Sequence, residues 1–142
     1  MKAITLLLAL QFFAWTSWAR DTDSGTSTLD PEGYVRDWLM LAPISLPEGA
    51  DAGELLLRTQ IPDEAHLKPR GGDSVQIQGR TLAWKPMTSA TNYADFNATL
   101  KSQNDQSVGY LVTYVVCDRE IPDVILSVGS NDQGRIYFNG VD

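Results

Sequence analysis

The clearest pattern of apolar and polar positions lies in the last third of the chain. VGYLVTYVVC, residues 108–117, carries β-branched and aromatic side chains on both faces, which is typical of a strand buried on two sides. DREIPD, residues 118–123, then predicts a turn. VILSVGS (124–130) and RIYFNG (135–140) follow as two further strands, because each is shorter than a typical helix and rich in strand-forming residues.

Two earlier segments also predict strands. YVRDWLMLAPI, residues 34–44, indicates a strand that ends at Pro43, although helix periodicity fits so short a segment as well. SVQIQGRTLAWK, residues 74–85, alternates apolar and polar positions around a Gly79-Arg80 turn, which predicts a β-hairpin. The alternation places Trp84 in the core.

The segments between these strands contain little regular structure. A short helix around Gly53 to Thr59 is expected inside a region rich in proline and glycine. TNYADFNATL (91–100) is ambiguous, and SQNDQS (102–107) indicates a turn-rich loop. Because no segment predicts a helix long enough to cross between parallel strands, we expect an all-β, antiparallel β-sandwich.

The first residues show the pattern of a secretory signal peptide. Lys2 precedes an apolar run from Ala3 to Trp15, and the small residues Ser17 and Ala19 are spaced like a signal-peptidase site. We therefore expect residues 1–19 to be removed by cleavage before Arg20, and the protein to be exported to the periplasm or the extracellular space. An N-terminal membrane anchor is the alternative, but the run is shorter than the roughly 20 apolar residues that span a bilayer.

Residues 20–33, RDTDSGTSTLDPEG, are polar and contain almost nothing to bury, which predicts a flexible arm before a folded domain over 34–142. Cys117 is the single cysteine and ends an apolar stretch, so we expect a small buried side chain and no intrachain disulfide. The residues left after cleavage hold 10 basic and 18 acidic side chains, a net charge of −8. This acidity argues against nucleic acid and anionic membranes as partners.

The stretch GSNDQGRIYFNG, residues 129–140, is the strongest candidate for a site. Asn131 to Gly134 indicate a hairpin loop, and the acids do not have the spacing of a helix–loop–helix calcium site. Asn139-Gly140 is a strong type I′ turn dipeptide. Alternation turns Ile136 and Phe138 to the core and leaves Tyr137 outside. A sugar site here would use the exposed Tyr137 together with neighbouring polar side chains, and one rim of it would consist of Asn131, Asp132, Tyr137 and Asn139.

Enzymatic motifs are sparse. His66 lies in a proline-rich loop without a recognisable partner, and no nucleophile elbow, phosphate loop or zinc-ligand spacing occurs. We therefore expect no catalytic residue, cofactor or metal. Three groups of acids, which we expect to be solvated, would supply a carboxylate pair for glycoside hydrolysis: Asp63-Glu64, Asp95 and Asp118-Glu120.

Several of these segments together resemble a known domain family. YVRDWLMLAPI, the series from Gly72 to Lys85, NYADFN at 92–97 and residues 108–140 are similar to the N-terminal part of jelly-roll, galactose-binding-like domains of exported bacterial proteins, such as the sugar-binding domain of family-two glycoside hydrolases. The resemblance implies a jelly-roll β-sandwich beside a carbohydrate-active catalytic domain. That family continues past Asn-Gly into further strands, so it also implies a fold that is incomplete at the C-terminal end.

Three functions follow as expectations. The first is a non-catalytic, exported module of carbohydrate-binding type, the N-terminal part of a longer carbohydrate-active protein, which binds glycan or packs against a catalytic domain. The second is a structural or protein-interaction module that completes its sheet with a partner. The third is a glycoside hydrolase that uses a carboxylate pair.

Overall fold

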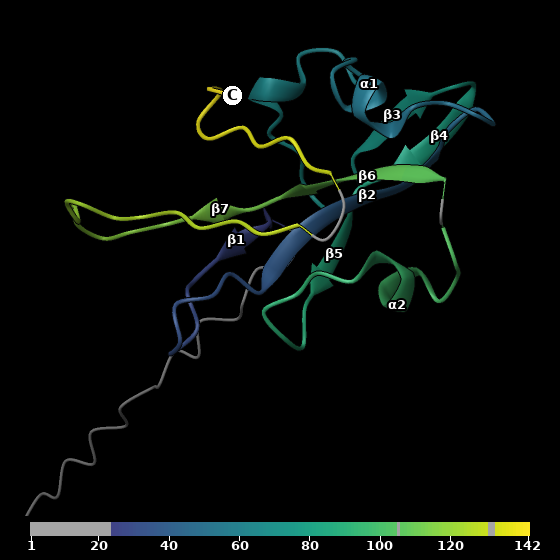
Figure 1. The fold of residues 1–142 in the computed structure, drawn as a ribbon. Helices are drawn as coiled ribbons and strands as arrows, with labels where there is room; N and C mark the ends of the chain where they lie inside the picture. Colours follow the sequence, from purple (N-terminus) through teal and green to yellow (C-terminus); the bar gives the residue numbers. More distant parts are fainter. Residues whose placement is uncertain (1–23, 105, 131–132) are drawn as a thin grey trace, which may run out of the picture.

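A computed structural model describes residues 24–104, 106–130 and 133–142, so the predicted signal peptide and its cleavage point lie outside the described residues (Figure 1). The regular structure of the described chain is mostly strand with little helix, and its larger sheets are antiparallel, which confirms the predicted β-rich class. The elements are β1 (Thr26–Ser27), β2 (Asp37–Ser45), α1 (Ala52–Leu56), the 3-10 helix η2 (Glu64–His66), β3 (Ser74–Ile77), β4 (Arg80–Ala83), β5 (Lys85–Thr88), α2 (Phe96–Leu100), β6 (Ser107–Val112) and β7 (Tyr114–Val115).

Strand β2 is the centre of the fold. It pairs antiparallel with β5 on one side and β6 on the other, in the order β5-β2-β6. Leu39 and Leu41 on this strand are fully buried, and the core that forms around them is completed by Ile44, Ile61, Ile77 and Trp84. The burial of Trp84 confirms the prediction made from its alternation with Leu82.

The predicted end of this strand at Pro43 is wrong, because β2 continues to Ser45. Proline lacks the N–H that a ladder bond needs, so a strand accommodates it at an irregularity. The pairing with β6 shifts register between Leu41 and Ile44, on either side of Pro43, and then resumes. The bulge lets one strand supply core residues both before and after the proline.

The predicted hairpin of residues 74–85 is present as β3 and β4. Its turn residues are Gln78 (φ 52°) and Gly79 (φ 74°), one position earlier than the sequence suggested. Two consecutive residues with positive φ make the type I′ turn that matches the twist of paired strands. The hairpin places Ile77 in the core, with Trp84 directly after β4.

Two short α-helices interrupt the series of strands, α1 after β2 and α2 after β5. The expected helix near Gly53 is α1, and the ambiguous segment 91–100 contains α2. Asp95 caps α2 by accepting a hydrogen bond from the Ala98 backbone N–H at 2.9 Å. Among the described residues, no helix has the length and apolar character needed to cross a membrane.

Residues 24–33, which we expected to form part of a flexible arm, belong to the folded body. β1 pairs in parallel with β7, joining Thr26 to Tyr114, and the Ser27 side chain is buried. The Asp30 carboxylate accepts backbone hydrogen bonds from Glu32 and Tyr34 and binds Arg36, which closes the following loop. Polar composition misled here because serine and aspartate meet the hydrogen-bonding needs of a tight loop.

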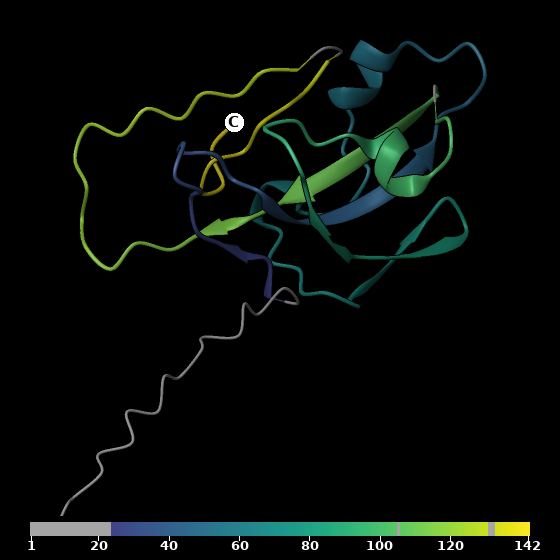
Figure 2. The same ribbon diagram turned by 90° about the horizontal axis from the view of Figure 1, so that it is seen from below.

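The two strands expected at 124–130 and 135–140 are absent from the described residues. After β7 the chain runs outward and returns as a wide excursion, plain in the view from below (Figure 2). Beyond β7, the described residues contain only one isolated antiparallel bridge, between Phe138 and Val141. Cys117 lies on this excursion and is exposed, so its predicted burial is wrong.

Candidate functional site

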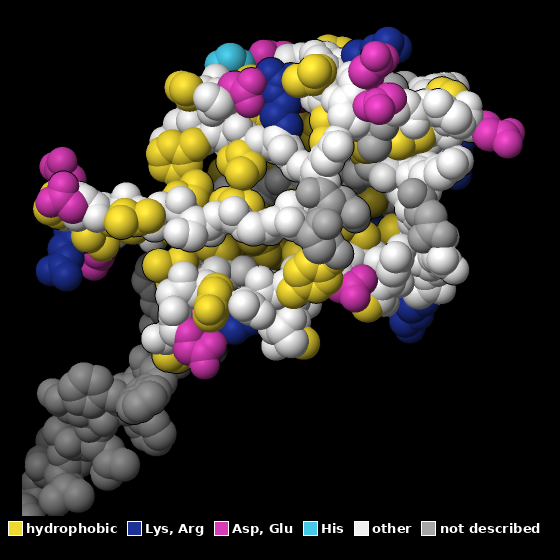
Figure 3. Space-filling model, in the orientation of Figure 1, with side chains coloured by type: hydrophobic (Ala, Val, Ile, Leu, Met, Phe, Trp, Pro, Cys, Tyr) yellow, Lys and Arg dark blue, Asp and Glu magenta, His cyan; other side chains and the backbone are white. Residues whose placement is uncertain are grey.

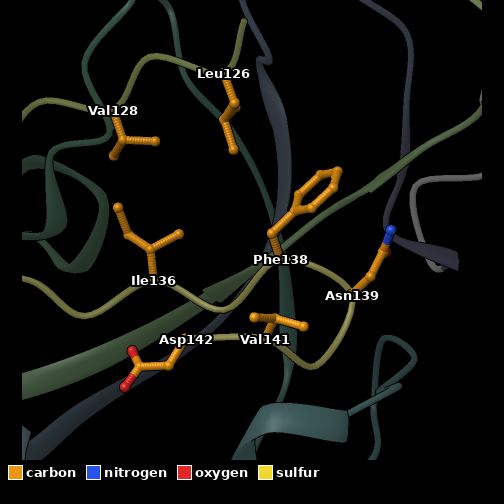
Figure 4. Close-up of a pocket in the computed structure, with 7 residues that line it drawn as sticks. All are labelled: Leu126, Val128, Ile136, Phe138, Asn139, Val141 and Asp142. Carbon is orange, nitrogen blue, oxygen red and sulfur yellow. The ribbon is translucent and has the colours of Figure 1, made fainter. Parts of the chain in front are cut away.

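The returning chain forms two legs with an open apolar hollow between them. We name residues 124–130 the first leg and residues 133–142 the second leg. The hollow has a volume of about 810 Å³. Its lining residues are Leu126, Val128, Ile136, Phe138, Asn139, Val141 and Asp142 (Figure 4).

Apolar side chains of the two legs face each other across the hollow. Leu126 and Val128 on the first leg point toward Ile136 and Phe138 on the second (Figure 4). These side chains stay accessible to solvent: Phe138 is 64 % exposed and Leu126 58 % exposed. Figure 3 shows apolar side chains gathered along the protruding excursion and beside the second leg. Large exposed apolar patches are rare on monomeric globular proteins.

The second leg alternates as the sequence predicted but faces the opposite way. Ile136 and Phe138, predicted to be core residues, point into the open hollow, whereas Tyr137, predicted to be exposed, is half-buried. The reversal has a physical cause. The Tyr137 hydroxyl donates a 2.7 Å hydrogen bond to the Glu64 carboxylate, which fixes which face of the leg turns inward.

Glu64 is the centre of a polar cluster beneath the second leg. It begins η2, and its side chain is only 7 % exposed. One carboxylate oxygen accepts the Tyr137 hydroxyl and the other accepts the Tyr110 hydroxyl of β6 at 2.8 Å. An Arg135 guanidinium nitrogen lies 3.9 Å from Glu64. We call Glu64, Tyr110, Tyr137 and Arg135 the Glu64 cluster.

The electrostatics of the Glu64 cluster keep both tyrosines protonated. Burial, and then the hydrogen bond to Glu64, raises the pKa of the Tyr110 hydroxyl above its ordinary value. The hydrogen bond to Glu64 is the main cause that raises the pKa of Tyr137. Each hydroxyl therefore keeps its proton, and its hydrogen bond to the carboxylate, to a higher pH than a free tyrosine would. The arrangement holds the second leg against β6 and η2.

Two further contacts fix the second leg. Arg135 forms a two-pronged ion pair with Asp142, with its Nε 3.0 Å from the carboxylate, and stacks over the Tyr137 ring at 5.0 Å. The hydrogen bond to Asp142 raises the pKa of Arg135 and lowers that of Asp142. The predicted Asn139-Gly140 turn is present, with positive φ at both residues and backbone hydrogen bonds between the residues that flank them.

Of the predicted sugar rim, Tyr137 and Asn139 lie in the part of the chain that the structure describes. Asn131 and Asp132 lie outside the described residues. Asn139 lines the hollow, but the Tyr137 hydroxyl is committed to Glu64 and its ring to Arg135. Among the residues that line the hollow, the aromatic one is Phe138, and it is exposed.

Sequence reasoning expected Glu64 to be solvated and Phe138 to lie in the core, and both expectations are wrong: the Glu64 side chain is 7 % exposed and Phe138 is 64 % exposed. No signal in the sequence joins Glu64 to tyrosines 46 and 73 positions away. The alternation of the second leg was visible, but its facing depends on that distant carboxylate. A polar residue that binds a neighbouring element can override the usual inward preference of an apolar pair.

The remaining chemical candidates have structural or solvated positions. The His66 side chain is 63 % exposed and lies 2.8 Å from Asp63, a partner that the sequence did not indicate. Asp95 caps α2, and Asp118 and Glu120 are exposed. Among the described residues, no group of three or more metal-ligating side chains comes together.

Comparison of the chain with protein-family models, with curated proteins and with solved structures finds no match.

Proposed function

We propose that the protein is a non-catalytic interaction module that binds another protein through the hollow. The observation that carries the proposal is the row of exposed apolar side chains on the two legs, on an excursion outside the sheets. Apolar surface of this extent is costly in water and is offset when a partner covers it. This function is the structural or interaction alternative drawn from the sequence, and the burial pattern moves it ahead of sugar binding.

Export and the jelly-roll relationship belong to the same proposal. The signal-peptide pattern supports an exported protein, and the antiparallel β5-β2-β6 sheet is compatible with one layer of a jelly-roll, galactose-binding-like sandwich. In such a sandwich the legs would be the place where further strands join. A catalytic domain in the same or another chain would be one suitable partner.

A site-specific photo-crosslinker tests the interaction proposal. Placed at Leu126, which lines the hollow, it is expected to give discrete adducts with a partner protein in the natural source. The matched control position is Ile125, which is 86 % exposed and equally apolar but does not line the hollow. A Val141→Asp change in the same chain should remove the Leu126 adducts, because a charge in the hollow opposes apolar contact. Equal adducts from both positions would contradict the proposal.

A glycan-binding module of the galactose-binding-like kind is the second candidate. Phe138 offers an exposed aromatic face, with Asn139 and Asp142 beside it as polar groups for sugar hydroxyls. If sugar is the ligand, Phe138→Ala should abolish retention of the protein on an insoluble polysaccharide panel, while Ile125→Ala leaves retention unchanged. Retention that survives Phe138→Ala, or no retention at all, would set this candidate aside.

A further inference from the structure

We infer that the partner segment which fills the hollow is an extended strand with apolar side chains on one face and basic residues on the other. This inference rests on the proposed interaction function and specifies the partner's chemistry. Three independent features of the excursion support it: its free backbone, the shape of its apolar lining and its charge.

The backbone of the first leg is available for pairing. No backbone hydrogen bond joins residues 124–130 to another described residue, and none of them belongs to a strand. The leg is nevertheless rich in residues that favour strands, with valine or isoleucine at 124, 125 and 128. Unpaired N–H and C=O groups on such a segment form a template to which an extended peptide adds.

The apolar lining has the spacing that a strand partner needs. Leu126 and Val128 are two positions apart on the first leg, and Ile136 and Phe138 are two positions apart on the second. This period of two is the repeat at which side chains of an extended chain turn to the same face. An added strand would therefore place its own apolar side chains between the two rows.

The negative charge of the excursion favours a basic partner. From residue 116 onwards the chain carries five acidic residues against two arginines, a net charge of −3. Arg135 already pairs with Asp142. From residue 116 onwards, the remaining described acids are Asp118, Glu120 and Asp123, and the remaining described base is Arg119. A second copy of the chain would also be acidic, which disfavours self-association. Basic residues on the partner remove this repulsion and increase the rate of association.

A pair of synthetic peptides tests the inference on the full chain. The probe is a fluorescent peptide of about ten residues that alternates valine and lysine, and its control alternates valine and glutamate. We expect the lysine peptide to bind in a fluorescence anisotropy titration, more weakly at high salt, and the glutamate peptide to fail. Leu126→Ser should weaken binding about tenfold, whereas Ile125→Ser should leave it unchanged.

The outcomes separate this inference from the function on which it rests. Equal binding of both peptides, or equal weakening by Leu126→Ser and Ile125→Ser, overturns the strand partner. Absence of peptide binding while Leu126 still crosslinks to a partner overturns the strand partner and leaves the interaction function standing. Absence of both peptide binding and crosslinking would overturn the strand partner and the interaction function together. A salt-dependent dimer of the chain that Leu126→Ser disrupts would show that the partner is a second copy and not a basic strand.

Discussion

At the scale of single residues, the orientation of the second leg depends on Glu64. Its carboxylate accepts two tyrosine hydroxyls from segments far apart in the sequence, Tyr110 on β6 and Tyr137 on the leg. A buried carboxylate without such donors would be strongly destabilising, so the buried position of Glu64 depends on the two tyrosine hydroxyls. Glu64 determines which face of the leg lines the hollow without itself belonging to the lining.

Alkaline pH should expose the role of the Glu64 cluster. Because the folded-state pKa of Tyr110 is raised, its contribution to stability is fully present below pH of about 10 and is lost as pH rises through the folded-state value. Tyr110→Phe removes a donor to a buried charged group, so it should cost about 1.5–3 kcal/mol near neutral pH and make the alkaline fall in unfolding free energy shallower. Urea unfolding followed by circular dichroism between neutral and strongly alkaline pH measures both effects. Parallel curves for the two proteins would contradict the assignment.

At the scale of elements, β6 packs closely against α2 because it carries a glycine. A Cβ on Gly109 would lie 2.5 Å from Phe96 Cε1 and 2.9 Å from Ala42 Cβ. We therefore expect Gly109→Ala to lower the unfolding free energy by about 1–3 kcal/mol, since α2 must move. The matched control is Gly129→Ala, where nothing lies within 4 Å, with an expected change of less than about 0.5 kcal/mol. Equal urea midpoints for the two variants would refute the close packing.

The success of sequence reasoning at this scale followed the range of the interactions. The hairpin of β3 and β4 and the Asn139-Gly140 turn were predictable, because local turn chemistry specifies them. The parallel pairing of β1 with β7 was not, since it joins Thr26 to Tyr114 across most of the chain. The first leg was predicted as a strand from composition alone, but a strand forms only where a neighbour accepts its hydrogen bonds.

At the scale of the whole molecule, the predicted export requires that the signal peptide be absent from the mature chain. The protein isolated from its natural source should begin at Arg20, because the small residues at 17 and 19 match a signal-peptidase site. N-terminal sequencing together with fractionation of the cells measures this directly. An intact Met1 in the membrane fraction would instead favour the N-terminal anchor that the same segment could form.

The exposed Cys117 offers a natural site for attaching a spectroscopic probe to the excursion. It is the single thiol of the chain and lies two residues after the end of β7, at the start of the segment that leads to the first leg. A thiol-reactive dye would therefore label this position alone, without any engineered cysteine. Its emission would report on the polarity around the excursion, so a partner that covers the apolar surface there could be followed in real time in the unmodified sequence.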